Sequence, residues 1–166
     1  VGLGGHMVGM YHLTTHAFFK ALLFLAAGSV IHGTHRQNIF ELGGLWRTMP
    51  WTAVTFAIGA LALCGVPGFS GFFSKDEILA LAHEHNIWLY GLATVTAGLT
   101  AFYTTRAGVV AFLGKPSPEL HPHESSPLML GPLVLLSVCS IAGGYLGIPV
   151  FLGAHAGPIR WDIAGT

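Results

Sequence analysis

Ala17-Phe-Phe-Lys-Ala-Leu-Leu-Phe-Leu-Ala-Ala-Gly-Ser-Val-Ile31 is an apolar run with one charged residue, Lys20, near its start. The whole chain has 166 residues, of which 52% are hydrophobic and 8% are charged. This composition is typical of membrane proteins. A charged side chain at the centre of a membrane-spanning helix costs roughly 2.5–3.5 kcal/mol on insertion scales, and such residues usually face the interior of a helix bundle. Lys20 therefore indicates ion or proton transport rather than a soluble enzyme site.

Further apolar stretches predict an all-α integral membrane fold with about four transmembrane helices. A spanning helix needs about 20 mostly apolar residues. Polar connectors separate four such stretches, and we expect the mixed tail from Pro149 to lie at the membrane interface. The predicted helices cover residues 8–32, 51–82, 87–113 and 128–148.

The second predicted helix contains Gly65-Val-Pro-Gly-Phe-Ser-Gly71. The whole stretch is too long for one straight crossing of a roughly 30 Å hydrocarbon core at about 1.5 Å per residue. Pro67 has no N–H to donate to the carbonyl of Leu63. Gly65 and Gly68 loosen the backbone further. We therefore predict a discontinuous helix, in the manner of transporters whose broken helices line a polar cavity.

Three titratable side chains recur every four residues in the first predicted helix: His12, His16 and Lys20. This spacing places them on one stripe, about one turn apart. Imidazole titrates near neutrality, and desolvation disfavours the charged form of a lysine. We interpret the stripe as a candidate proton relay with Lys20 buried in the bundle; packing or interfacial histidines are the alternative. No carboxylate lies on that turn, and we predict no metal site.

Lys75 and Asp76 follow the predicted break. The start of a half-helix carries a positive partial charge, which favours an ionised Asp76 and disfavours a charged Lys75. Burial acts on Lys75 in the same direction. We therefore include both residues in the candidate relay. The alternative is that the span ends at Phe73 and leaves them in a solvated flank, although apolar residues continue over 78–82.

Other classes of function find no support in the sequence. Net charge is zero and no basic run occurs, so nucleic-acid binding has no electrostatic footprint. No GxGxxG or Walker motif is present, and Cys64 and Cys139 cannot supply a CxxC pair or an iron–sulfur ligand set. We therefore expect no cofactor in this chain. Two histidine pairs are interpreted as surface loops: His83 with His85, and His121 with His123.

Lys and Arg occur in two of the three predicted connectors, residues 33–50 and 114–127. The connector over residues 83–86 contains neither. The positive-inside rule places the first and third connectors on the cytoplasmic side, or on the matrix side in an organelle. The chain begins at Val1 without a methionine. We expect residues 1–166 to be a single transmembrane segment of a longer subunit.

Taken together, the motifs resemble a known family. His12-Leu-Thr-Thr-His-Ala-Phe-Phe-Lys-Ala-Leu-Leu-Phe-Leu25 and Gly65-Val-Pro-Gly-Phe-Ser-Gly-Phe-Phe-Ser-Lys-Asp-Glu-Ile-Leu79 are similar to the antiporter-like subunits of proton-translocating NADH–quinone oxidoreductase, or respiratory complex I. The similarity is greatest to the group called subunit L or chain 5. Less specific similarities lie at Gly43-Gly-Leu45, Ala101-Phe-Tyr103 and His121-Pro-His-Glu-Ser125.

The resemblance implies proton translocation as part of that complex, coupled to electron transport through redox centres in other subunits. It implies that Lys20 is a central proton carrier beside His12 and His16, and that Lys75, next to Asp76, serves the exit side. It also implies other membrane subunits of complex I and the lipid bilayer as partners, in a bacterial or organellar inner membrane. Two alternatives remain: the large subunit of a multi-subunit sodium–proton antiporter, and a structural membrane subunit with inert lysines.

Overall fold

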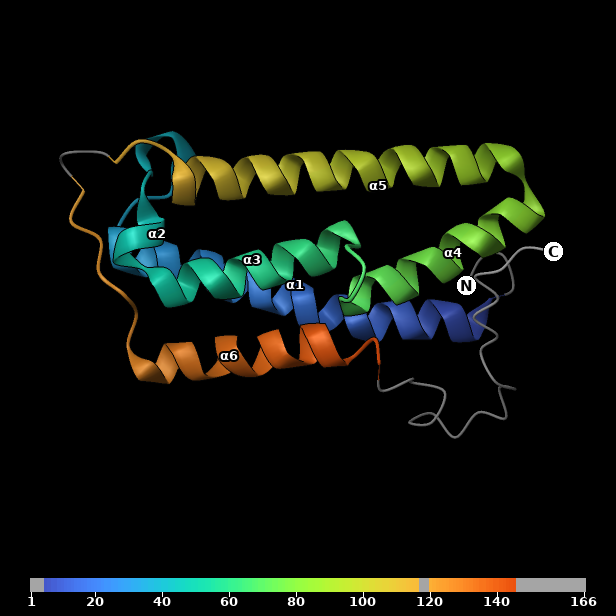
Figure 1. Cartoon of the computed structure of the whole chain (residues 1–166), viewed down its shortest axis with the longest axis horizontal. Coiled ribbons are helices and arrows are strands. Elements are labelled where there is room, and N and C mark those ends of the chain that lie inside the picture. The colour runs from blue at the N-terminus through green and yellow to red at the C-terminus, as the bar shows by residue number, and fades with distance from the viewer. Residues whose placement is uncertain (1–4, 117–119, 146–166) are drawn as a thin grey trace.

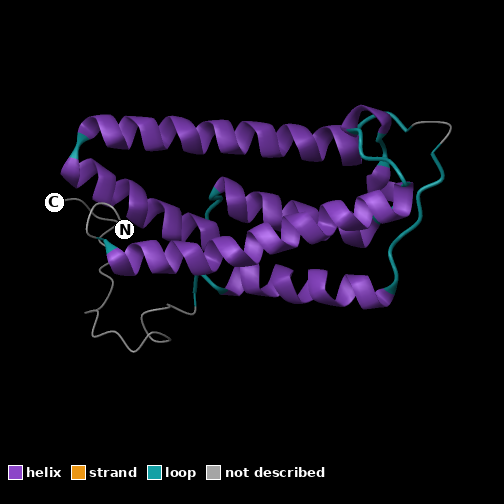
Figure 2. Cartoon of the chain, turned by 180° about the vertical axis from the view of Figure 1, so that it is seen from behind, coloured by secondary structure: helices purple, strands orange, loops and turns teal. Residues whose placement is uncertain are grey.

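A computed structural model of the chain describes residues 5–116 and 120–145. These residues form helices joined by loops, and no strand occurs among them. In Figure 1, α5 and α6 lie on opposite sides of a central group made of α1, α3 and α4, and Figure 2 shows the same arrangement from behind. The all-α prediction is therefore confirmed for the described residues. The elements are α1 (His6–Thr34), η1 (Ile39–Glu41), α2 (Leu45–Thr48), α3 (Pro50–Cys64), α4 (Ser70–His85), α5 (Ile87–Gly108), η2 (Val109–Leu113) and α6 (Pro127–Ala142).

The helix boundaries follow the predicted stretches with differences at their ends, and the short helix α2 lies within the predicted connector 33–50. The second stretch, predicted to end at residue 82, continues in α4 to His85. The third stretch, predicted over 87–113, is α5 followed directly by a short π-helix, η2. The fourth was predicted to run to residue 148, but α6 ends at Ala142 and residues 143–145 form a turn. Gly143 and Gly144 explain this end, because glycine is a poor helix former. Residues 146–148 and the tail from Pro149, predicted to be interfacial, lie outside the described residues.

Length and composition single out α1 as a membrane span. Among the described residues, α1 alone is both long and apolar enough to cross a membrane by itself. The apolar helices α3 and α6 have 15 and 16 residues, fewer than the roughly 20 that a straight crossing needs. Of the roughly four predicted spans, only α1 is therefore long and apolar enough by itself among the described residues. A crossing by α3 would need α4 to continue it.

The chain is non-helical between Cys64, where α3 ends, and Ser70, where α4 begins. This is the stretch in which the sequence predicts an interruption. Gly65 and Gly68 have φ angles of 78° and 95°, a left-handed region that residues with a Cβ rarely adopt. The two half-helices nevertheless continue one another end to end (Figure 1). The result is one long, discontinuous element rather than two independent helices.

The start of α4 passes very close to the end of α3. A Cβ atom at Gly71 would overlap the backbone carbonyl of Ala62 and would lie 3.4 Å from the ring of Phe19 on α1. Glycine at this position therefore lets α3, α4 and α1 meet at the break. This close packing places the side chains that follow Gly71 directly against α1.

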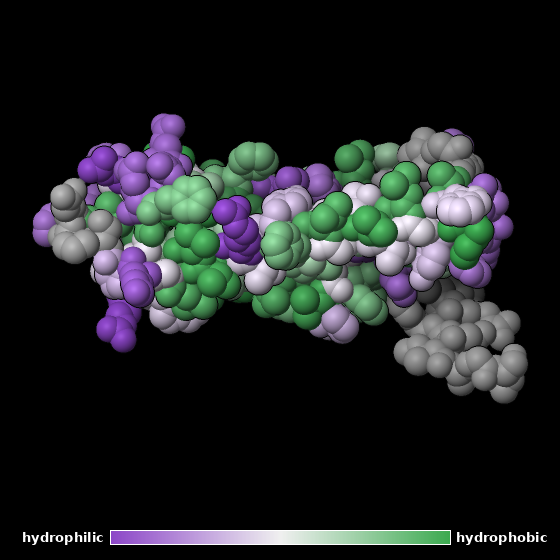
Figure 3. Space-filling view, turned by 90° about the horizontal axis from the view of Figure 1, so that it is seen from above, coloured by the Kyte–Doolittle hydropathy of each residue, from purple (hydrophilic) through white to green (hydrophobic). Residues whose placement is uncertain are grey.

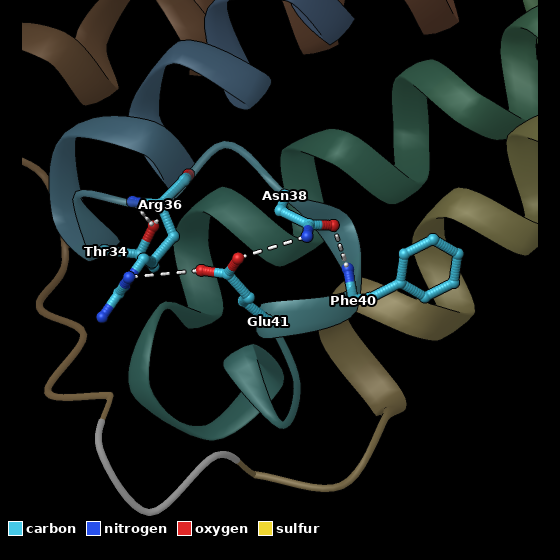
Figure 4. A network of polar contacts seen from close by, with 5 residues as sticks. All are labelled: Thr34, Arg36, Asn38, Phe40 and Glu41. Atoms are coloured by element: carbon cyan, nitrogen blue, oxygen red, sulfur yellow. Dashed lines mark hydrogen bonds and ion pairs between the residues drawn. The ribbon is translucent and has the colours of Figure 1, made fainter.

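A polar network orders the first connector (Figure 4). The Arg36 guanidinium pairs with the Glu41 carboxylate at 3.3 Å, and the Asn38 amide donates to the same carboxylate at 3.2 Å. Asn38 also caps η1, since its side-chain oxygen accepts the N–H of Phe40 at 3.1 Å. The Thr34 hydroxyl accepts the N–H of Arg36 at 3.3 Å. These local contacts return the chain from α1 toward α2 and α3.

Large apolar side chains cover much of the outside of the bundle. Phe24, Trp88 and Leu128 are 71%, 83% and 87% exposed. Figure 3 shows hydrophobic surface, crossed by a few hydrophilic residues, between two ends where hydrophilic residues gather. Extended apolar surface of this kind marks contact with lipid or with other protein.

Candidate functional site

A cavity of about 920 Å³ lies between α1, α4 and α5, beside the helix break. Most of its lining is aliphatic. Four basic side chains that the sequence predicts as relay residues also line it, and they come from two different helices: His12, His16, Lys20 and Lys75. The structure thus brings the α1 stripe and the lysine after the break to one space.

The α1 stripe keeps the one-turn spacing that its sequence predicts. The ring centroids of His12 and His16 are 5.7 Å apart, and His16 packs against the edge of Phe19 at 5.2 Å. The side-chain hydrogen bond of His12 goes to Ser74 and not to His16. Proton transfer between these rings therefore needs an intervening water or a ring rotation.

The sequence led us to expect Lys20 to be enclosed in the bundle. In the structure it is half-buried. Its ammonium group lies 5.5 Å from the centroid of the Phe24 ring, one turn further along α1. Phe24 itself is exposed. The long lysine side chain therefore spans from the cavity toward the outer edge of α1, because its flexible stem can cover apolar surface while the charged group stays near the rim.

Ser74 on α4 connects α4 to the α1 stripe. Its hydroxyl lies 3.0 Å from Nδ1 of His12 and accepts the hydroxyl hydrogen of Thr15 at 2.9 Å. Both Ser74 and Thr15 are fully buried. Sequence reasoning did not assign Ser74 a role. The available signal was the pair of small residues Ser70 and Ser74, spaced four apart, which is typical of a close contact between membrane helices.

Lys75 bonds directly to the broken backbone. Its amine donates to the carbonyl oxygen of Leu63 at 3.3 Å. This carbonyl is the one that a continuous helix would have paired with residue 67, and Pro67 has no N–H. The Lys75 amine therefore occupies the place of the missing donor. It also lies at the C-terminal end of α3, where the partial negative charge of the helix favours a cation.

This contact changes the electrostatic expectation for Lys75. The sequence predicted that the positive start of α4 and burial both disfavour its ammonium form. In the structure, the end of α3 supplies the nearest favourable partner. Asp76 is exposed and does not line the cavity, because adjacent residues on a helix point about 100° apart. Of the two predicted residues, the structure brings only Lys75 to the site.

The wall that α5 contributes is less charged. Thr96, Thr100 and Tyr103 line the cavity. The Thr100 hydroxyl donates to the carbonyl of Thr96 at 2.9 Å, and the Thr96 hydroxyl bonds to Leu92 in the same way at 2.8 Å. Their hydrogens are therefore used within α5, and their oxygens remain as acceptors toward the cavity.

The histidine pairs predicted as surface loops lie at opposite ends of the bundle. His83 and His85 belong to the last turn of α4 rather than to a connector. His121 and His123 lie in the third connector and are exposed. Within the described part of the chain, no three His, Cys, Asp or Glu side chains converge as a metal-binding group would.

We expect Ser74→Ala to weaken the contact between α4 and α1. The substitution leaves Nδ1 of His12 without its partner, which costs about 1–3 kcal/mol for a buried polar group. The Thr15 hydroxyl keeps its second acceptor, the His12 carbonyl at 3.1 Å. The thermal unfolding temperature of the full-length subunit in its membrane complex measures this loss. Ser126→Ala, at an exposed serine, is the matched control. Equal unfolding temperatures for the two variants would contradict the role given to Ser74.

Comparison with known proteins places this geometry in a family. The family model described as "NADH:quinone oxidoreductase/Mrp antiporter, TM" matches residues 1–100. The chain is 43% identical over 90% of its length to NAD(P)H-quinone oxidoreductase chain 5 of a Picosynechococcus species, and 44% identical over 88% to NADH-quinone oxidoreductase subunit L of Rickettsia conorii. Among solved structures, the Mrp complex from a Dietzia species superimposes with a TM-score of 0.76 at 25% identity, covering 86% of this chain and 35% of the other.

The chain spans about a quarter of the length of these curated relatives, 27% of the first and 23% of the second. The family match nevertheless includes α1, the break, α4 and the first part of α5. These are the elements that carry all four basic side chains of the cavity. The chain therefore belongs to the transmembrane NADH:quinone oxidoreductase/Mrp antiporter family.

Proposed function

We propose that this chain conducts protons across a membrane as part of NADH–quinone oxidoreductase, with His12, His16, Lys20 and Lys75 as the proton-carrying side chains. The observation that carries the proposal is their arrangement. Two lysines and two histidines from two helices line one cavity beside a helix break. Ionisable residues inside membrane segments commonly mark proton pathways.

In the proposed membrane topology, α3 and α4 together form one crossing, and α1, α5 with η2, and α6 form three more. The first and third connectors then lie on the cytoplasmic or matrix side, at the opposite end from the loop between α4 and α5. The two hydrophilic ends of the bundle support this topology (Figure 3). The proposed location is a bacterial or organellar inner membrane.

A proton can move along the α1 stripe in short steps. His12 is bound to Ser74 through Nδ1, which leaves Nε2 for proton exchange. Ser74 can both accept and donate through its hydroxyl, so its bond to His12 is compatible with either imidazole tautomer. Water in the cavity would carry the proton between His12, His16 and Lys20. Asp76, which faces away, has no step in this scheme.

Lys75 is suited to a change of charge at the break. Its ammonium form has three N–H donors, and the neutral amine keeps two. The bond to the Leu63 carbonyl therefore survives when a proton leaves, and the side chain stays in place. Release of the proton exposes a lone pair that can accept the next one. Redox chemistry in other subunits would bias these charge states, and this chain itself would hold no cofactor.

The second candidate function is that of a large subunit of a sodium–proton antiporter complex. The observation that favours it is the structural similarity to the Mrp complex, with a TM-score of 0.76. The higher sequence identity to the quinone oxidoreductase subunits, 43% and 44% against 25%, supports our first assignment. Both candidates use neighbouring membrane subunits as partners.

The combined variant Lys20→Ala, Lys75→Ala tests the proposed function. The assembled complex, with the full-length subunit, is reconstituted in vesicles, and proton uptake per NADH oxidised is measured with and without a sodium gradient. We expect proton uptake to fall strongly while NADH oxidation by the redox subunits continues. Normal proton uptake would establish a structural subunit instead, and uptake that depends on sodium would establish the antiporter.

A further inference from the structure

The half-helix α3 is held at both ends by charged side chains from other elements. At its C-terminal end the Lys75 amine bonds to the Leu63 carbonyl. At its N-terminal end the Glu124 carboxylate, from the third connector, accepts the N–H groups of Trp51 and Thr52 at 2.9 and 3.3 Å. Each charge has the sign that the adjacent helix end favours. The arrangement therefore places α3 between an anion and a cation.

Glu124 is itself fixed by further bonds. Its other oxygen accepts the Thr52 hydroxyl at 2.6 Å and the N–H of Ser125 at 3.2 Å. The Ser125 hydroxyl lies 2.6 Å from that of Ser29 on α1, and the Ser29 hydroxyl lies 2.8 Å from that of Thr52. Ser29 and Thr52 are fully buried, and Ser125 is 5% exposed. Glu124 thus ties α3 to α1, the helix that carries the relay stripe.

The helix break links the position of α3 to the hydrogen bond of Lys75. Helical hydrogen bonds make α3 a rigid rod, whereas residues 65–69 have left-handed glycines and no helical ladder. A shift of α3 along its axis would be absorbed at the break. It would also move the Leu63 carbonyl relative to Lys75, which belongs to α4. The position of α3 along its axis therefore sets the distance from the Leu63 carbonyl to the Lys75 amine.

We propose that Glu124 is a positioning residue for Lys75: by holding the N-terminus of α3, it fixes the Leu63 carbonyl that binds the Lys75 amine. The role of Lys75 as a proton carrier rests on the proposed function, but the positioning does not. Loss of the Glu124 charge loosens the anchored end and withdraws the carbonyl. The Lys75 ammonium then loses a favourable partner and gives up its proton at lower pH.

Other titratable groups lie near Glu124 and near Lys75, and they are the same in every variant that is compared. Near Glu124 these are three histidines, since the ring of His32 adjoins those of both His35 and His123. Around Lys75 they are His12, His16 and Lys20 from α1, Cys64 from α3 and Tyr103 from α5. None of them is altered in the variants below, so a shift between variants reports on Glu124.

The test measures how fast Lys75 reacts with a small, membrane-permeant acylating reagent as a function of pH, by mass spectrometry of the full-length subunit in its complex. Only the neutral amine reacts. For Glu124→Gln we expect the pH midpoint of Lys75 labelling to fall by about one unit, because a bond to a charged group contributes roughly that much. Below the midpoint, labelling should be about tenfold faster. Glu124→Asp, which keeps the charge, should lower the midpoint by less than Glu124→Gln does.

Glu41→Gln is the matched control, since Glu41 is a carboxylate of the first connector that pairs with Arg36 (Figure 4). It should leave Lys75 labelling unchanged. An unchanged midpoint in Glu124→Gln, or an equal shift in Glu41→Gln, overturns the proposal. A second readout is the alkaline limb of the pH profile of proton uptake. A shift in labelling without any effect on uptake supports the positioning role and rejects the relay role of Lys75, so the two failures are distinguishable.

Discussion

Replacing Lys75 by arginine should stop proton translocation nearly as completely as replacing it by alanine. Arginine keeps the positive charge and can still donate to the Leu63 carbonyl at the end of α3, but it does not release a proton under physiological conditions. If Lys75 carries a proton, we expect proton uptake per NADH oxidised to fall at least about tenfold in both variants, because a positioned proton-transfer group typically contributes about a hundredfold or more. Uptake in vesicles containing the reconstituted complex measures this effect.

The control for Lys75→Arg is Lys115→Arg, at an exposed lysine of the third connector. This control should pump normally. Assembly of the complex, judged by gel migration and NADH oxidation, should be intact in both arginine variants because the charge is kept. Normal pumping by Lys75→Arg would make Lys75 an electrostatic anchor for the end of α3, and the relay would then have to end at Lys20.

Lys20→Ala should also lower proton uptake at least about tenfold. Lys20 is the last titratable group of the α1 stripe, and its side chain reaches from the cavity to the rim beside Phe24. Alanine removes the proton-carrying group without breaking a hydrogen bond of the fold, and alanine favours the helix. We therefore expect loss of pumping with little loss of stability, measured as uptake and as thermal unfolding of the same preparations.

Lys115→Ala is the matched control for Lys20→Ala and should lose neither property. A stable Lys20→Ala complex with unchanged uptake per NADH oxidised would exclude Lys20 from the path. A lower unfolding temperature that accompanies the loss of uptake would indicate that Lys20 acts through packing of its stem on Phe24 rather than through its proton.

Local features of the sequence predicted two parts of the site. The stripe of His12, His16 and Lys20 follows from a spacing of four in a helical run, because 3.6 residues make one turn. The interruption over residues 65–69 follows from Pro67 and the flanking glycines, because a missing N–H and left-handed φ angles are properties of single residues. Both are local, so a pattern along the chain was sufficient to predict them.

The extent of burial at Lys20 and the direction of Asp76 could not be predicted in this way. The sequence led us to expect an enclosed Lys20, and the structure leaves it half-buried. It also led us to group Asp76 with Lys75, whereas their side chains point in different directions from α4. An apolar run shows that a side chain is among helices, but the rotation of that helix against its neighbours depends on packing between elements.

Sequence patterns were sufficient to predict that this chain is helical and apolar, where its helix breaks, and which basic side chains share a stripe. The partners of these side chains depend on how the helices and loops pack together. Ser74 meets His12 across 62 positions of the chain, and Glu124 meets Thr52 across 72. Periodicity carries no information about such pairs. They form because α4 and the third connector pack against α1 and α3, where a buried polar group must find a partner.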